Sequence, residues 1–86
     1  MNIILYADFK SPQINNDFKI SNALIEEHTV LLVTSIDQLK ASMNAYDIIL
    51  LGLSIDKDFI EISKKYIKLK PEWDINKINY EISKIS

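Results

Sequence analysis

The side chains that could take part in chemistry are few in this 86-residue chain, and most of them follow three apolar segments. They are Asp8, Lys10 and Ser11 after the first segment, Thr34 at the end of the second, Gly52 near the end of the third and Ser54 after it. A carboxylate, an ammonium group and hydroxyls gathered in one place could hold a phosphate or a nucleotide, helped by helix N-termini, which attract anions. These six residues form a candidate ligand-binding site, although serines at such positions also serve as helix caps.

The composition excludes several kinds of active site. The chain has no Cys, which rules out disulfides, thiolate nucleophiles and cysteine-based metal centres. It has one His, His28, and one Gly, so a catalytic triad has a single available base and a glycine-rich phosphate loop cannot form. Asp8 is the only acid of the candidate site, and one carboxylate is a poor magnesium site. We therefore expect no catalytic residue, no bound metal and no cofactor.

The charge balance argues against binding to nucleic acid or to an acidic membrane. Ten Lys and no Arg stand against twelve acidic residues, which gives a net charge of −2. The basic cluster formed by Lys64, Lys65, Lys68 and Lys70 is expected to be a solvated face. No apolar segment has the form of a signal peptide or a membrane helix, so a cytoplasmic location is expected.

The three apolar segments span residues 3–6, 29–34 and 47–53, and each is nearly continuous rather than alternating. This pattern is typical of strands buried on both faces of a parallel sheet. The first helix between them is predicted to begin at a cap supplied by Ser11 with Pro12, or by Asn15 or Asn16. Its buried stripe is predicted to consist of Ile14, Phe18, Ser21 and Ile25, widened by Ile20 and Leu24.

Two helices are predicted in the middle of the chain. Ser35 and Gln38 form a capping-box pattern that opens a helix ending near Asn44, with Leu39 and Met43 on its buried side. A further helix is expected to begin at a cap supplied by Ser54 or Asp56 and to end near Lys65. The segment from Tyr66 to Leu69 either ends that helix or forms a fourth strand.

The last helix has the best-defined start. Asp74 is its predicted N-cap, and Trp73 is expected to pack on Ile78 as a hydrophobic staple. An apolar seam repeats along it at Ile75, Ile78, Ile82 and Ile85. Together with Trp73, this seam either covers one face of the sheet or takes part in binding another chain.

Strands that alternate with helices predict an α/β fold, with right-handed crossovers and a parallel sheet covered on both faces. We expect a small three-layer, doubly wound sheet of three or four parallel strands in the order 2-1-3(-4). A single domain is expected over residues 1–86.

Four segments carry a resemblance to a known family: Asn2-Ile-Ile-Leu-Tyr-Ala-Asp8, Ala23-Leu-Ile-Glu-Glu-His28, Thr29-Val-Leu-Leu-Val-Thr-Ser35 and Tyr46-Asp-Ile-Ile-Leu-Leu-Gly-Leu-Ser54. From Asn2 to about Ile67 the chain resembles the front half of a flavodoxin-like domain, most closely the receiver domain of response regulators. Receivers open with a strand ending in two acids, and the Asp that ends their third strand accepts phosphate. Here Ala7 stands for the first acid and Gly52 for the phosphoacceptor. The resemblance therefore implies a truncated receiver without phosphoryl transfer.

Two other families share this layout. Flavodoxins have a similar third strand, but the segment after Asp8 lacks their hydroxyl- and glycine-rich phosphate loop. Sugar-phosphotransferase B subunits are similar in size, but their phosphorylated Cys has no counterpart here. These resemblances support one fold and do not supply an active site.

A scaffold that lacks its active-site groups predicts a non-catalytic regulatory or inhibitory module that works by protein–protein contact. The expected partner is another protein, with a homodimer also open, and the small size suits a phage or mobile element. The alternative is a domain that binds a nucleotide, flavin or phosphate in the crevice at the strand C-termini. A fragment of a larger enzyme, such as a two-lobed glycosyltransferase, is a third interpretation.

Overall fold

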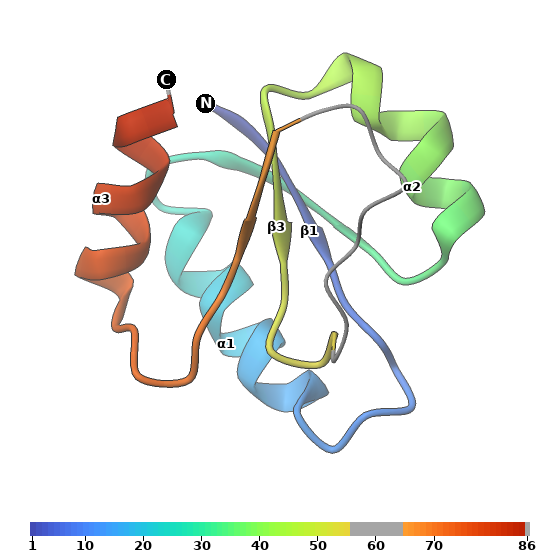
Figure 1. Cartoon of the computed structure of the whole chain (residues 1–86), viewed down its shortest axis with the longest axis horizontal. Coiled ribbons are helices and arrows are strands. Elements are labelled where there is room, and N and C mark those ends of the chain that lie inside the picture. Colours follow the sequence, from blue (N-terminus) through green and yellow to red (C-terminus); the bar gives the residue numbers. More distant parts are fainter. Residues whose placement is uncertain (56–64, 86) are drawn as a thin grey trace.

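The computed structural model describes residues 1–55 and 65–85, which form a parallel sheet with helices on both faces (Figure 1). The elements are, in chain order, β1 (Asn2–Tyr6), α1 (Ile14–Leu24), β2 (Thr29–Val33), α2 (Ile36–Ser42), the 3-10 helix η1 (Met43–Ala45), β3 (Ile48–Leu51), β4 (Tyr66–Lys68) and α3 (Ile75–Ile85). The helix predicted to follow Ser54 or Asp56 falls on residues outside the described ranges.

The four strands are parallel and lie in the order β2-β1-β3-β4. In the centre of the sheet, Ile3 of β1 is in register with Val30 on one side and with Ile48 on the other. The segment from Tyr66 to Leu69, predicted to be either a helix end or a fourth strand, supplies the strand β4. This strand pairs with β3, with Tyr66 in register with Ile49. The predicted α/β class and strand order are confirmed, and the layout is consistent with a flavodoxin-like fold.

Two hydrophobic cores lie on opposite faces of the sheet. Leu24 of α1 and Ile78 of α3 contribute to one, which we call the α1/α3 core. Leu39 of α2 contributes to the other, the α2 core. Alternate residues of β3 face the two cores, Ile48 and Leu50 the first, Ile49 and Leu51 the second. All four are fully buried, which explains why this segment is continuously apolar.

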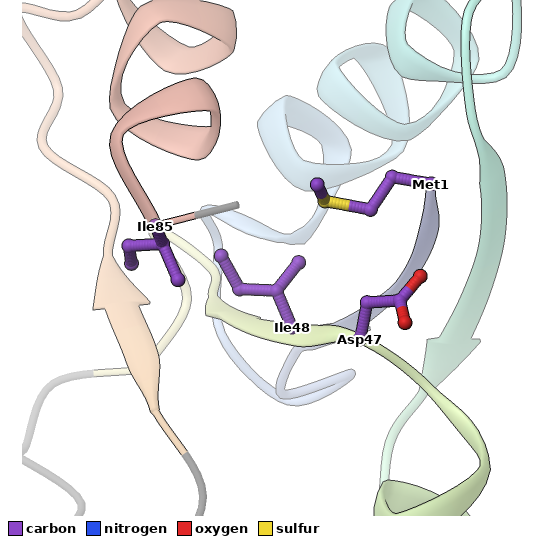
Figure 2. Close-up of a pocket in the computed structure, with 4 residues that line it drawn as sticks. All are labelled: Met1, Asp47, Ile48 and Ile85. Atoms are coloured by element: carbon purple, nitrogen blue, oxygen red, sulfur yellow. The ribbon is translucent and has the colours of Figure 1, made fainter.

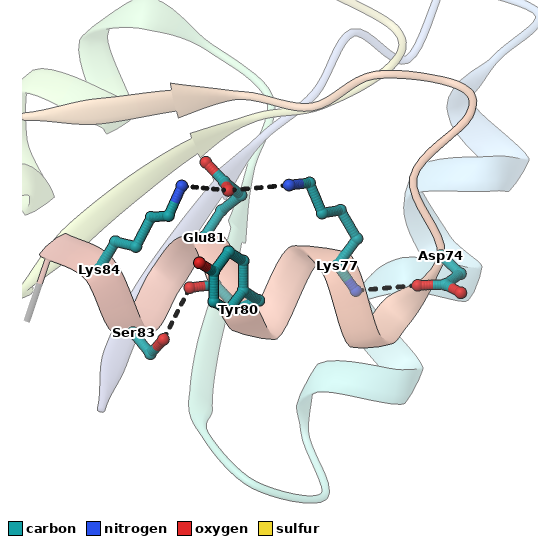
Figure 3. A network of polar contacts seen from close by, with 6 residues as sticks. All are labelled: Asp74, Lys77, Tyr80, Glu81, Ser83 and Lys84. Carbon is teal, nitrogen blue, oxygen red and sulfur yellow. Dashed lines mark hydrogen bonds and ion pairs between the residues drawn. The ribbon is translucent and has the colours of Figure 1, made fainter.

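The predicted starts of α2 and α3 are confirmed. Ser35 Oγ accepts a hydrogen bond from the backbone N–H of Gln38 (3.1 Å), and α2 passes into η1 close to the predicted end. At α3, Asp74 Oδ1 accepts a hydrogen bond from the backbone N–H of Lys77 (2.8 Å; Figure 3). Each cap satisfies one of the N–H groups that the first turn of a helix leaves without an intrahelical partner.

The predicted start of α1 is wrong, and its predicted buried face is correct at Ser21 and Leu24 but wrong at Ile25. Ser11 does not cap the helix, because its Oγ accepts a hydrogen bond from Gln13 N–H (3.1 Å) in a turn that precedes α1. Asn15 and Asn16, the alternative caps, lie inside the helix. The buried residues of α1 are Asp17, Ser21 and Leu24, whereas Ile25 is 56% exposed. Asp17, which the prediction did not include, is the further buried residue of this face.

The apolar seam of α3 lies against the sheet. Ile78 and Ile82 are buried in the α1/α3 core, and Ile75, Ile85 and Trp73 pack against the same core while remaining partly exposed. The seam therefore covers this face, the first of its two predicted roles, and Ile78 and Ile82 have no surface to offer another chain.

The outer face of α3 carries charged and aromatic side chains (Figure 3). Glu81 forms ion pairs with Lys84 (3.1 Å) and Lys77 (3.2 Å). Hydrogen bonds from Lys84 and then Lys77 lower the pKa of Glu81, and the same contact raises the pKa of Lys84. Exposed pairs of this kind contribute little to stability.

None of the helices in the described part of the chain has the length and the apolar composition that a membrane span requires.

Candidate functional site at the strand carboxyl ends

The parallel arrangement brings three of the six predicted site residues together. Gly52 N–H donates to the carbonyl oxygen of Tyr6 (2.8 Å), which continues the β1–β3 ladder. Two residues later, Ser54 Oγ accepts a hydrogen bond from the backbone N–H of Asp8 (2.8 Å). The ends of β1 and β3 are thus joined where a flavodoxin-like sheet would bind a ligand.

The other three predicted residues have local roles. The backbone N–H of Lys10 donates to Asp8 Oδ1 (3.0 Å), and that of Ser11 donates to the carbonyl of Asp8 (3.1 Å). Both residues therefore shape the turn after β1. Thr34 belongs to the start of α2, where its N–H donates to Gln38 Oε1 (3.4 Å).

The centre of the site is Asp17, a fully buried residue of α1 that the sequence analysis did not select. Its Oδ1 accepts a hydrogen bond from Leu53 N–H (2.7 Å). Its Oδ2 accepts one from Ser54 N–H (3.0 Å) and one from Ser54 Oγ (2.5 Å). Successive backbone N–H groups in such a turn form an anion-binding concavity. In this protein the anion is a side chain of the chain itself.

Gly52 leaves the space that Asp17 needs. A Cβ atom at position 52 would lie 2.5–2.7 Å from the two oxygens and the carboxyl carbon of Asp17, closer than such atoms approach one another. The φ angle of Gly52 is not positive. Glycine is therefore required here because Asp17 approaches closely, and not because the backbone is left-handed.

Lys68 fixes the same loop from the other side. Its Nζ donates to the carbonyl oxygen of Gly52 (2.9 Å) and, at 3.4 Å, to that of Leu69. The interpretation of this lysine as part of a solvated basic face is therefore wrong. Lys65 and Lys70 are exposed, as that interpretation expects, and Lys64 lies outside the described residues.

Asp17 and Ser54, at the centre of the site, are buried, whereas Asp8 is exposed. Ser54 is 2% exposed, and its hydroxyl both donates to Asp17 and accepts from Asp8. His28 precedes β2 at the amino-terminal edge of the sheet, where its Nε2 contacts Asn79 Oδ1 (2.9 Å). It therefore cannot act as a base for Ser54, at the carboxyl edge. The described residues include no group of three or more acidic or His side chains placed to hold a metal ion.

Tyr6 is the titratable group beside this site with a perturbed pKa. Burial, together with the nearby negative charge of Asp8, raises the pKa of the Tyr6 hydroxyl above its usual value of 10.0. The phenol is therefore held neutral. It is not prepared to act as a base.

Asp17 leaves a detectable signal in the sequence. It lies three residues after Ile14 and four before Ser21, so it falls on the side of the helix that also carries Leu24. A charged residue on a buried stripe requires a hydrogen-bonded partner. The partners themselves, Leu53 and Ser54, are fixed only by the fold.

A cavity of about 360 Å³ lies at the amino-terminal ends of β1 and β3, opposite the candidate site (Figure 2). It is lined by Met1, Asp47, Ile48 and Ile85. The Asp47 carboxylate is already engaged, since its Oδ2 accepts a hydrogen bond from Asn2 N–H (2.9 Å). None of the six predicted site residues lines this cavity.

Comparison with protein-family models, with curated proteins and with solved structures gives no match to this chain.

Proposed function

We propose that this chain is a non-catalytic module that acts by protein–protein contact, built on a receiver-like form of the flavodoxin scaffold. The carboxylate of Asp17 carries the proposal. It occupies the N–H groups of Leu53 and Ser54, which in a ligand-binding domain of this layout would face a bound anion. With those donors engaged, the strand ends serve the stability of the fold rather than recognition.

A surface suited to protein contact lies at the β2 edge of the sheet. In the part of the chain that the structure describes, β2 pairs with β1 on one side and with no strand on the other. Its five residues, Thr29–Val33, include no charged residue and no Pro, the devices that usually protect an edge strand. Open edges of this kind bind partners by adding a strand.

Ligand binding at the strand ends, the alternative function, would require Asp17 to move. A phosphate approaching Leu53 and Ser54 would meet the Asp17 carboxylate, which carries the same sign of charge and already accepts their hydrogen bonds. Displacing it would leave a buried charge without partners, which is strongly unfavourable. We therefore expect inorganic phosphate, flavin mononucleotide and adenosine triphosphate not to bind there.

An amide NMR titration of the full chain tests the proposal. The amide signals of Leu53 and Ser54 are expected to stay in place with each of the three probes. Asp17→Ala is the comparison, because it frees both N–H groups while leaving Gly52 unchanged. Saturable shifts at Leu53 and Ser54 in the unmodified chain would contradict the proposal and favour the ligand-binding alternative.

A further inference from the structure

The pairing of β2 with β1 determines which main-chain groups β2 presents at its open edge. Thr29 N–H donates to the carbonyl of Met1 (3.0 Å), and the carbonyl of Val33 accepts from Ala7 N–H (3.0 Å). Because the peptide groups of a strand alternate in direction, every second residue of β2 faces β1. The N–H and C=O groups of Val30 and Leu32 therefore point away from the sheet.

The open edge stops at both ends of β2. On the amino-terminal side, His28 N–H donates to the carbonyl of Leu24 (2.9 Å). On the carboxyl-terminal side, Thr34 N–H donates to Gln38 Oε1 (3.4 Å). A long added strand could not extend the ladder through these donors. Within β2 itself the edge offers four main-chain groups, the N–H and C=O of Val30 and of Leu32.

These four groups are complementary to themselves. Val30 and Leu32 lie symmetrically on either side of Leu31, so a two-fold axis at Leu31 sets Val30 of one copy opposite Leu32 of the other. In an antiparallel pair, residues placed in this way exchange both of their N–H···O=C bonds. Two such pairs satisfy all four groups on each copy.

We propose that the β2 edge binds the β2 edge of a second copy of this chain, antiparallel and with its two-fold axis at Leu31. The two sheets then form one sheet of eight strands with each helical layer continued on its own face. Val30 and Leu32 extend the α1/α3 core across the junction, and Leu31 extends the α2 core. This inference rests on the proposed function and names its partner.

The charges near β2 predict how the association responds to salt. Glu26 and Glu27 precede the strand, Asp37 follows it, and all three are exposed. Antiparallel pairing brings the acidic residues before β2 of one copy towards Asp37 of the other. Salt screens this repulsion, so dimerisation is expected to strengthen as ionic strength rises. The contact is small beside a standard interface, so a concentration-dependent dimer is expected.

Cysteine crosslinking tests the register, because the natural chain has no Cys. Two Leu31→Cys chains face each other directly in a pair without mutual hydrogen bonds, where Cα atoms are about 4.5 Å apart and a disulfide can form. The matched controls Val30→Cys and Leu32→Cys lie diagonally from their own copies, beyond the roughly 7 Å limit. Leu31→Cys is expected to form a covalent dimer about tenfold faster than either control. Equal rates, or faster crosslinking of a control, would overturn the proposed register.

Hydrogen exchange tests the pairing without any substitution. The amides of Val30 and Leu32 are expected to exchange about tenfold more slowly at high than at low protein concentration. Those of Thr29 and Val33, which face β1, serve as internal controls and should not respond. Sedimentation should give a dimer for Val30→Ala and a monomer for Val30→Pro, which lacks the outward N–H. Circular dichroism checks that both variants fold.

A chain that stays monomeric at millimolar concentration, with concentration-independent exchange at Val30 and Leu32, overturns the self-pairing. That result does not contradict the proposed function, which the titration with phosphate, flavin mononucleotide and adenosine triphosphate tests. The two proposals can therefore fail separately. Pairing of the β2 edge with a different protein strand would retain the proposed function and contradict this inference about its partner.

Discussion

Asp17 brings a charge into a fully buried position, where hydrogen bonds from Leu53 and Ser54 replace its water. Asp17→Asn keeps the size of the side chain but places an NH₂ group against donors that need an acceptor. We expect it to lower the free energy of unfolding by about 2–4 kcal/mol. Urea denaturation followed by circular dichroism measures the change.

Asp37→Asn is the matched control for this substitution. Asp37 also lies in the first turn of a helix but is exposed, so its substitution should change stability by about 0.5 kcal/mol or less. If Asp17→Asn were as mild as Asp37→Asn, the carboxylate would not be what holds the loop after β3.

The contact between Gly52 and Asp17 predicts a non-additive pair of substitutions. Gly52→Ala places a methyl group against the Asp17 carboxylate, and we expect it to cost about 1–3 kcal/mol of unfolding free energy. In an Asp17→Ala background the clash is absent, so the cost of Gly52→Ala should be smaller by about 1 kcal/mol or more. A double-mutant cycle by urea denaturation measures the interaction. Simple additivity would show that Gly52 is required for another reason.

Tyr6 predicts a loss of stability in strong alkali. Its folded-state pKa is raised above 10.0 by burial and by Asp8, so the folded chain favours the neutral phenol more than the unfolded chain does. This contribution is complete below pH 10.0 and is lost as pH rises through the higher folded-state value. Tyr6→Phe should therefore lose less stability than the natural chain over this range. Urea denaturation of both chains at neutral and at alkaline pH measures the change. Equal losses of unfolding free energy in Tyr6→Phe and in the natural chain would refute the prediction.

At the scale of elements, the helix starts differ in how they are held. Asp74 and Ser35 each accept a backbone hydrogen bond from the third residue after them, whereas Ser11 precedes α1 and does not cap it. We expect Asp74→Ala and Ser35→Ala each to lower the unfolding free energy by about 1 kcal/mol, and Ser11→Ala to cost clearly less. Thermal denaturation of the three variants ranks them. A cost for Ser11→Ala equal to the other two would contradict the assigned start of α1.

The same elements show what the sequence could and could not predict. Strands buried on both faces produce continuous apolar segments, so β1, β2 and β3 are recognisable locally, as are the caps Ser35 and Asp74. The candidate site is different. The contact between Asp17 and Ser54 joins residues 37 positions apart, and nothing near Asp17 names its partner. The strand β4 has only three residues, too few to show a periodicity in the sequence, and only its pairing with β3 identifies it as a strand.

At the scale of the whole molecule, the two cores share the strands of one sheet. Leu50 faces the α1/α3 core and its neighbour Leu51 faces the α2 core, and both are fully buried. A domain of this length is expected to have a free energy of unfolding of about 4–13 kcal/mol. Either core, once disrupted, would remove much of it, because the backbone of β3 belongs to both.

This sharing predicts that the two cores unfold together. Leu50→Ala and Leu51→Ala should each cost about 2–5 kcal/mol, and Ile25→Ala, at an exposed position, much less. Trp73, the only Trp, packs on the α1/α3 core, so its fluorescence reports one face while far-UV circular dichroism reports the whole chain. The two signals should change at the same urea concentration in each variant. A Leu51→Ala chain whose dichroism changed before its fluorescence would show that the α2 core unfolds separately. The sheet would then not couple its faces.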